Sequence, residues 1–158
     1  NYAAEYGVPV KVARLAQTFG AGVSKTDNRV FAQFARSVIN NEDIILHTTG
    51  ELCRCYCYTI DAVTAMLYLL LRGENGEAYN VANSDTYISI RNMAEFVAES
   101  FNPGNVKVVI CPQEGLGYSP TTKLRLDTKR IKQIGWQPEY GLKEMFSRLI
   151  ESMKVDDV

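Results

Sequence analysis

The chain has 158 residues, near the size of one folded domain and long enough to bury a substantial core. With 46% hydrophobic and 22% charged residues, its composition is that of a soluble globular protein and excludes a disordered or collagen-like chain. The formal net charge of -1 provides no overall field for a polyanion, and the longest apolar run, residues 65–71, is far shorter than the roughly 20 residues that span a bilayer. We therefore expect neither a nucleic-acid partner nor a membrane segment.

The first half of the chain is expected to alternate helices and strands. The elements are the end of a helix, a strand, a helix and two strands, over residues 1–6, 10–16, 30–41, 43–47 and 53–60. Gly7 suits the left-handed position that closes a helix, and the nearly continuous apolar run after it predicts a strand buried on both faces of a parallel sheet. Asp27 or Asn28 is expected to cap the helix that follows.

The second half continues the same alternation. Its expected elements are a helix, a strand, a helix, a strand and two helices, over residues 62–71, 78–81, 90–99, 106–111, 127–134 and 142–153. Asp61 and Ser89 are the expected caps of the first two helices, residues 112–120 form a Gly/Pro loop, and Trp136 is expected to anchor a core. The order predicts a mixed α/β fold without repeats or an interdomain linker.

The cysteine and histidine content argues against a metal site. Cys53, Cys55 and Cys57 alternate along one predicted strand, Cys111 is remote, and His47 is the only histidine. No Cys-x-x-Cys pair or other set of converging ligands results, so we expect no bound metal. The cysteines are interpreted as small apolar side chains in a reducing cytosol, and the start at Asn1, without Met or an apolar leader, predicts no signal peptide.

Searches for catalytic motifs find none that is complete. Residues 20–22 begin like the glycine-rich dinucleotide fingerprint, but Lys25 stands at the third glycine position and no helix follows at once. There is no phosphate-binding P-loop, no nucleophile elbow and no Tyr-x-x-x-Lys pair, in which the ammonium would lower the pKa of the phenol. Taken alone, the chain does not contain a catalytic apparatus.

Cations at turns and strand ends are the remaining candidates for ligand binding. Arg54 follows Gly50, where a guanidinium can fork onto a phosphate while the glycine lets the backbone approach. Arg29 lies at a helix start, and Lys123 and Arg125 alternate on one face of an extended segment. For each of these cations the alternative is a solvated surface side chain.

Two uncharged side chains are further candidates. Gln17 follows the predicted buried strand and is placed to offer its amide to a ligand at the carboxyl end of a sheet. His47 is able to stack on a base or to hydrogen-bond it. The alternatives are an amide satisfied within a loop and a half-exposed strand histidine.

Several short motifs, in order along the chain, resemble those of the extended short-chain dehydrogenases/reductases, the nucleotide-sugar epimerases and dehydratases. Residues 6–20 resemble their Y-G-x-P…R-x-x-N-x-Y-G-P segment. The other resemblances are to R-V-x-x-F, G-x-x-x-R-x-[FWY], Y-V-x-D-x, G-x-x-Y-N-[VI], S-I/V-x-E and L-D-x-S-K…L-G-W-x-P, at residues 28–31, 50–56, 58–62, 77–81, 89–90 and 126–138. Each motif is weak alone, but their order over residues 2–153 is specific.

The resemblance implies a fold and a domain organisation. Members of the family are about twice as long and begin with a Gly-rich Rossmann half that carries Tyr-x-x-x-Lys, which would lie upstream of Asn1. Residues 1–158 therefore resemble the C-terminal substrate-binding region of an α/β, Rossmann-like fold, with mixed small sheets and flanking helices. Residues 7–18 and 77–83 would be strands of the Rossmann sheet, and no catalytic residue lies within the chain.

The resemblance also implies site residues. These are the substrate-binding candidates Gln17, Arg29, His47, Arg54, Lys123 and Arg125, with Ala16 beside the cofactor. Arg54 matches the arginine that binds the diphosphate, and Gln17 replaces an asparagine near the same ligand. His47 takes a place beside the nucleotide that is often Tyr or Phe. Lys123 or Arg125 falls near a late phosphate-binding arginine, and the spacing leaves the choice between them open.

The function implied is that of the substrate-binding half of an NAD(P)-dependent epimerase, dehydratase, decarboxylase or reductase acting on a nucleoside-diphosphate sugar. NAD or NADP would serve the parent protein and is not expected to bind this fragment, which is expected to be inactive alone. The alternatives are a non-catalytic sugar-nucleotide-binding or scaffold protein of the same fold and a stand-alone sensor. Unpaired strand edges and uncovered apolar faces predict a homo-oligomer, with exchanged elements among its forms.

Overall fold

The computed structural model describes residues 2–113 and 121–155. The helices are α1 (Tyr2–Tyr6), α2 (Val30–Asn40), α3 (Thr59–Arg72), α4 (Ile90–Phe101), α5 (Lys129–Gln133) and α6 (Leu142–Val155). The strands are β1 (Val12–Leu15), β2 (Gln17–Phe19), β3 (Ile44–Leu46), β4 (Cys53–Tyr58), β5 (Ala78–Val81), β6 (Asn83–Ser89) and β7 (Val108–Ile110). The expected mixed α/β fold is confirmed, although β2 and β6 are strands beyond those expected.

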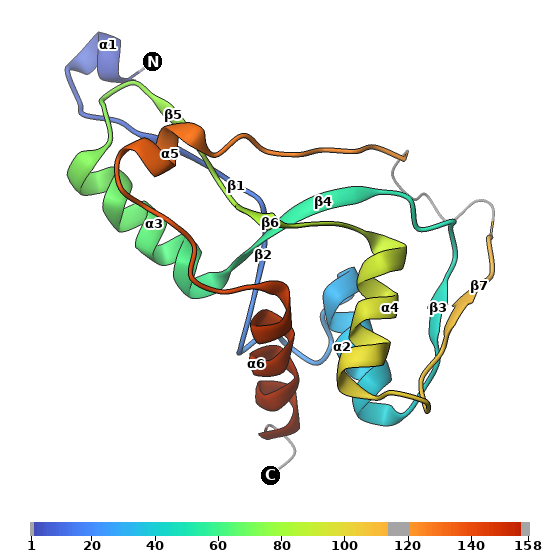
Figure 1. Cartoon of the computed structure of the whole chain (residues 1–158). Coiled ribbons are helices and arrows are strands. Elements are labelled where there is room, and N and C mark those ends of the chain that lie inside the picture. The colour runs from blue at the N-terminus through green and yellow to red at the C-terminus, as the bar shows by residue number, and fades with distance from the viewer. Residues whose placement is uncertain (1, 114–120, 156–158) are drawn as a thin grey trace.

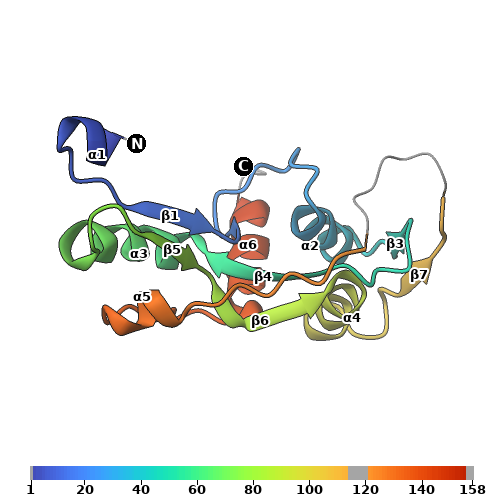
Figure 2. The ribbon, with the colours of Figure 1, turned by 90° about the horizontal axis from the view of Figure 1, so that it is seen from above.

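Three small sheets follow one another along an elongated molecule (Figure 1). β1 and β5 form a parallel pair at one end, where α3 and α5 lie beside them. The middle sheet has the order β2-β4-β6, with β2 parallel and β6 antiparallel to β4. At the other end β3 pairs in parallel with β7, and α2 and α4 lie between that pair and the middle sheet, as the view from above shows (Figure 2).

Two clusters of buried side chains hold the fold together. The main core joins α2, α4 and α6 to the middle sheet around Phe19, whose ring centroid lies 4.4 Å from that of Phe31 and 5.1 Å from that of Phe146. The second cluster, the α3 core, packs α3 and β5 around Trp136, which is 1% exposed and donates its indole N–H to Thr64 Oγ1 at 3.1 Å. Trp136 therefore anchors a core, as expected.

Several helix boundaries are confirmed. Ser89 caps α4 by accepting a hydrogen bond from the backbone N–H of Asn92 at 3.1 Å, and Gly7 has φ +66° just after α1. α2 and α6 occupy nearly the ranges that their apolar spacing predicts.

Among the described residues, no helix is long and apolar enough to cross a bilayer. Most of the expected Gly/Pro loop lies outside the described residues.

The strand expected over residues 7–18 is two strands, and the first is not buried. β1 ends at Leu15 and β2 begins at Gln17 in a different sheet. Val12 and Leu15 are 44% and 48% exposed. The reason is that β1 has one neighbour, β5, in its sheet, so its apolar side chains have too little structure around them to be covered.

The expected helix caps Asp27, Asn28 and Asp61 are wrong. Arg29 and Tyr58 occupy the N-cap positions of α2 and α3, without side-chain capping bonds. Asp61 lies within the first turn of α3 and is 2% exposed. Its carboxylate accepts the backbone N–H groups of Glu139 at 3.0 Å and Tyr140 at 3.1 Å, which ties the start of α3 to the segment before α6.

Large apolar side chains of α3 also point outward. Their spacing places them along one side of the helix, here called the α3 outer face: Ile60, Val63, Met66, Leu67, Leu70 and Leu71. The opposite side carries Ala62, Ala65 and Leu69 into the α3 core. α3 is thus apolar nearly all round, the pattern of a helix covered on more than one side.

Candidate functional site

A cavity of about 260 Å³ lies where β2, β4 and α2 meet the segment after β3. Its polar lining includes Gln17, His47 and Arg54, three of the residues singled out in the sequence. Apolar walls come from α2 and β3. The mixture of apolar walls with a few convergent polar groups is typical of small-molecule sites.

Strand pairing brings two of these side chains together. Gln17 opens β2 and lies opposite Tyr56 of β4 in the parallel register, so the side chains of Gln17 and Arg54 come from adjacent strands. His47 directly follows the last residue of β3. Residues separated by up to 37 positions in the sequence therefore share one cavity, because the starts of β2 and β4 and the end of β3 lie beside α2.

Arg54 is held in place by a second segment of chain. Its Nη1 donates to the carbonyl oxygens of Cys53 at 2.8 Å and Thr122 at 3.1 Å, and its Nη2 donates to Thr122 Oγ1 at 2.7 Å. The backbone of Cys53 also bonds to both Thr122 and Leu124. Within residues 2–113 and 121–155 no carboxylate forms an ion pair with Arg54, so its charge is held by neutral acceptors and is available to an anion.

His47 has an unusual environment within the cavity lining. Its Nδ1 is buried and has no hydrogen-bond partner among the described residues. The backbone carbonyl of His47 accepts a bond from Gln113 N at 3.0 Å, which fixes the start of the segment after β3. The buried Nδ1 of His47 is therefore a polar atom without a hydrogen-bond partner among the described residues.

Tyr56 and Cys57, in or near the cavity wall, are not chemically activated. Burial raises the pKa of Tyr56 to about 12 and that of Cys57 to about 12. Both groups therefore keep their protons at neutral pH and serve neither as a base nor as a nucleophile.

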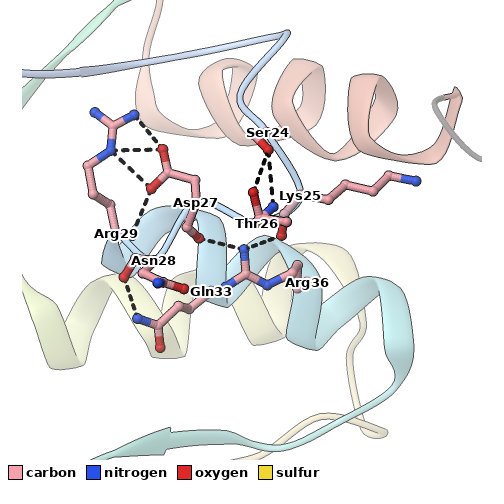
Figure 3. A network of polar contacts seen from close by, with 8 residues as sticks. All are labelled: Ser24, Lys25, Thr26, Asp27, Asn28, Arg29, Gln33 and Arg36. Carbon is pink, nitrogen blue, oxygen red and sulfur yellow. Dashed lines mark hydrogen bonds and ion pairs between the residues drawn. The ribbon is translucent and has the colours of Figure 1, made fainter.

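Arg29 does not belong to this cavity. The Asp27 carboxylate accepts hydrogen bonds from Arg29 Nη2 at 2.6 Å and from the Arg29 backbone N–H at 2.8 Å. Figure 3 shows this pair of residues. These hydrogen bonds lower the pKa of Asp27 below its usual value. Arg36 completes the network by donating to the backbone carbonyls of Lys25 and Asp27 (Figure 3). Arg29 therefore shapes the loop before α2, and its charge is already paired.

Lys123 and Arg125 also lie apart from the cavity. Lys123 lines a hollow with Gly50 and Arg91, and Arg125 lines another with Lys129 and lies 5.6 Å from the centre of the Tyr87 ring. The structure thus brings together Gln17, His47 and Arg54 and leaves the other three candidates elsewhere.

Gly50 has a different role from the one expected. A Cβ at this position would lie 2.9 Å from the backbone nitrogen of Arg91, whose N–H donates to the Gly50 carbonyl at 3.0 Å. Gly50, with φ +72°, is therefore required for close packing against the start of α4, a role that its place in the sequence does not indicate.

Several polar lining residues were not singled out from the sequence, among them Gln33 of α2 and Glu51. Gln33 lies one helical turn after Val30, another lining residue, so the helical period would have placed it on the correct side. Glu51 directly follows Gly50, and nothing in its spacing distinguishes it from a surface carboxylate.

At Ala16 and Gly20, the two positions considered for a dinucleotide, the backbone is already engaged by the protein itself. The backbone N–H of Ala16 already donates to the Val81 carbonyl at 2.9 Å, so it is not free for a nicotinamide. A Cβ at Gly20 would lie 2.4 Å from the Tyr58 ring, so this glycine serves packing rather than a pyrophosphate. Residues 2–113 and 121–155 also contain no group of three His, Cys, Asp or Glu side chains placed to hold a metal ion.

Comparison with known proteins gives consistent matches. Residues 1–82 match the NAD dependent epimerase/dehydratase family. The chain is 25% identical over 156 residues to UDP-glucuronic acid decarboxylase 5 of Arabidopsis thaliana, covering 98% of this chain and 44% of that protein. It is 25% identical to dTDP-D-glucose 4,6-dehydratase of Bos taurus, covering 96% of this chain and 42% of that protein. The chain thus spans less than half the length of these relatives.

A solved structure shares the fold. UDP-glucose 4-epimerase of Thermotoga maritima, determined with UDP-glucose, superimposes with a TM-score of 0.83 at 24% identity, covering 98% of this chain and 49% of that one. The expected architecture, a part of an extended short-chain dehydrogenase fold, is confirmed.

Proposed function

Because the chain belongs to the NAD-dependent epimerase/dehydratase family, we propose that its cavity binds the nucleoside diphosphate of a nucleotide sugar. One observation carries the proposal. Arg54 presents a guanidinium without an ionic partner among the described residues, fixed by Thr122, in a cavity that it shares with Gln17 and His47. A guanidinium held in this way is suited to fork onto phosphate oxygens.

The other groups that line the cavity contact different parts of the proposed ligand. The Gln17 amide, on the strand adjacent to that of Arg54 and in the same cavity lining, donates a further bond to the diphosphate or the first sugar hydroxyl. The apolar walls from α2 and β3 exclude water from the nucleoside and so strengthen the bonds to the phosphates. The cavity therefore supplies a clamp for the diphosphate and a wall for the nucleoside.

The role of the chain is binding rather than catalysis. The sequence contains no Tyr-x-x-x-Lys pair, and the described residues offer no cradle for a dinucleotide. When bound to the parent protein, NAD or NADP would supply hydride transfer at the sugar. We assign to this chain the positioning of the substrate in an epimerase, dehydratase, decarboxylase or reductase reaction, and no turnover by itself.

The proposal also covers the self-association of the chain and its cellular compartment. The α3 outer face, Val12 and Leu15 expose several large apolar side chains, which favours self-association or exchange of elements between copies. Four free cysteines favour a reducing compartment, and we propose the cytoplasm.

Calorimetric titration with UDP-glucose tests the binding role. Arg54→Ala is expected to weaken binding about 10- to 100-fold, because a charged hydrogen-bond partner of the diphosphate is lost. Arg148→Ala is the matched control, since Arg148 pairs with Glu144 on α6, and its affinity is expected to equal that of the wild type. Equal affinity in Arg54→Ala and the wild type would remove the basis of the proposal.

A further inference from the structure

We propose that Thr122 is a positioning residue for Arg54: it holds one edge of the guanidinium and leaves the Nε–Nη2 edge to fork onto a phosphate. This inference rests on the proposed function, because it concerns the same cavity and the same diphosphate. It goes further in two ways. It gives a role to a residue outside the cavity lining, and it states which N–H groups of Arg54 meet the ligand.

The hydrogen bonds of Arg54 identify the free edge. A guanidinium has five N–H groups, one on Nε and two on each of Nη1 and Nη2. Nη1 has two acceptors, the carbonyl oxygens of Cys53 and Thr122, and Nη2 has one, the hydroxyl oxygen of Thr122. Within residues 2–113 and 121–155, no acceptor binds Nε of Arg54. The N–H of Nε and one N–H of Nη2 therefore remain for a ligand.

These two N–H groups lie on the same side of the guanidinium. Thr122 contacts Nη1 at 3.1 Å and Nη2 at 2.7 Å, so it lies along the edge that these two nitrogens share. The other N–H of Nη2 points away from that edge and runs parallel to the N–H of Nε, because the group is planar. Two parallel N–H groups are the arrangement that binds two oxygens of a phosphate. By occupying one edge, Thr122 selects the other for the ligand.

The backbone fixes Thr122 independently of the guanidinium. The Thr122 carbonyl accepts the N–H of Cys53 at 3.0 Å, and the N–H of Leu124 donates to the Cys53 carbonyl at 3.2 Å. The segment thus pairs in parallel with the start of β4, through a bridge between Lys123 and Cys53. Because the backbone holds the acceptors in place, the long side chain of Arg54 loses less conformational freedom when it binds a ligand.

Neutral acceptors are suited to this task. A carboxylate in the place of Thr122 would also hold the guanidinium, but it would offset the charge that attracts a diphosphate. Arg29 has that arrangement in the same chain, since its guanidinium is paired with Asp27. The hydroxyl and carbonyl oxygens of Thr122 orient Arg54 and leave its positive charge uncompensated.

The first test observes the edge itself. In ¹H–¹⁵N spectra of the arginine side chains, the Nε–H signal of Arg54 is the one that disappears in Arg54→Lys. UDP-glucose is expected to move this signal downfield in the wild type, because Nε–H gains a phosphate acceptor. The Nε–H signal of Arg148, which already donates to Glu144 at 2.8 Å, should stay in place. Binding of UDP-glucose with an unmoved Arg54 Nε–H signal would overturn the assignment of the edge.

The second test measures the contribution of Thr122 by calorimetry. Thr122→Val removes the hydroxyl acceptor but keeps the shape and the backbone bonds. It is expected to weaken UDP-glucose binding about three- to tenfold, the cost of ordering one long side chain on binding. Thr122→Ser keeps the hydroxyl and should bind as the wild type does. In an Arg54→Ala background, Thr122→Val should cause no further loss, because the hydroxyl acts through the guanidinium.

The outcomes separate this inference from the proposed function. If Arg54→Ala weakens binding and Thr122→Val does not, the positioning role is overturned and the diphosphate clamp stands. The same holds if Thr122→Val weakens binding equally with and without Arg54, since the hydroxyl would then contact the ligand directly. If Arg54→Ala binds UDP-glucose as tightly as the wild type, the proposed function fails and the inference with it.

Discussion

The two ends of the molecule differ in how completely their apolar side chains are covered. Around the main core, three helices close over the middle sheet, and Phe19, Phe31 and Phe146 are almost fully buried. At the β1–β5 end the α3 core is small, and Leu71 is 85% exposed on the α3 outer face. The main core is thus closed around its aromatic rings, while the β1–β5 end presents an apolar surface suited to a further layer of structure.

The largest expected effect tests this contrast directly. Phe146→Ala should lower the free energy of unfolding by about 3–5 kcal/mol, because it opens a space among packed aromatic rings. Leu71→Ala should change it by less than about 0.5 kcal/mol, since the side chain is already in water. Denaturant titrations of both variants measure the difference. Similar losses would show that the α3 outer face is covered in solution.

The next effect concerns the link between the two ends. Asp61→Ala removes the acceptor of the Glu139 and Tyr140 backbone N–H groups, and should cost about 2–3 kcal/mol of unfolding free energy. Asp61→Asn keeps one acceptor oxygen and should recover part of that loss. Thermal unfolding of the two Asp61 variants measures both losses of stability. A tolerated Asp61→Ala would show that these buried bonds do not join α3 to the segment before α6.

Alkaline pH should weaken both cores through groups that burial keeps protonated. Burial raises the pKa of Cys57 in the α3 core from 9.0 to about 12, and that of Tyr56 in the main core from 10.0 to about 12. The unfolded chain loses these protons first, so the stabilisation is complete below pH 9 and is lost as the pH rises toward 12. Urea midpoints measured from pH 8 to 11 should fall accordingly.

Two cysteine variants test whether the buried thiol causes the loss of stability at alkaline pH. Cys57→Ala should make the decline with pH shallower, while Cys111→Ala, at an exposed position, should leave it as in the wild type. An identical decline in the wild type and Cys57→Ala would contradict the assignment to the buried thiol.

Charged substitutions on the α3 outer face are expected to reduce self-association of the chain and to have the smallest effect on its stability. The double variant Leu67→Glu, Leu70→Glu places charges on the α3 outer face and should shift light-scattering masses toward the monomer. The unfolding free energy of the monomer should change by less than about 1 kcal/mol, because both positions are exposed. A wild type that stays monomeric at high concentration would contradict the proposed self-association.

Much of the fold could be predicted because local signals agree with the final packing. The Ser89 cap, the apolar spacing of α2 and the amphipathic pattern of α6 are each sufficient to place a helix. β6 was not foreseen, because Asn83 and Ser84 favour turns. Pairing with β4 outweighs that preference, and the Thr86 hydroxyl accepts the Tyr56 backbone N–H at 2.8 Å where the register shifts.

Burial and charge pairing could not be read from the sequence in the same way. β1 has the composition of a central strand, yet its exposure depends on which strands lie beside it. Asp61 has the chemistry of a helix cap, but backbone N–H groups 78 and 79 residues away capture its carboxylate. Arg29 and Arg54 are both candidate phosphate-binding cations in the sequence, but in the structure Arg29 pairs with Asp27, whereas Arg54 is held by Thr122 in the cavity lining.

The most direct test of the central claim is to locate the ligand on the chain. Addition of UDP-glucose to the ¹⁵N-labelled protein should shift the backbone amide signals of Gln17, His47 and Arg54 most strongly, because they surround one cavity. The signals of Arg125 and Lys129, in a separate hollow, should stay in place. Shifts confined to that hollow, with the cavity signals unchanged, would contradict the account.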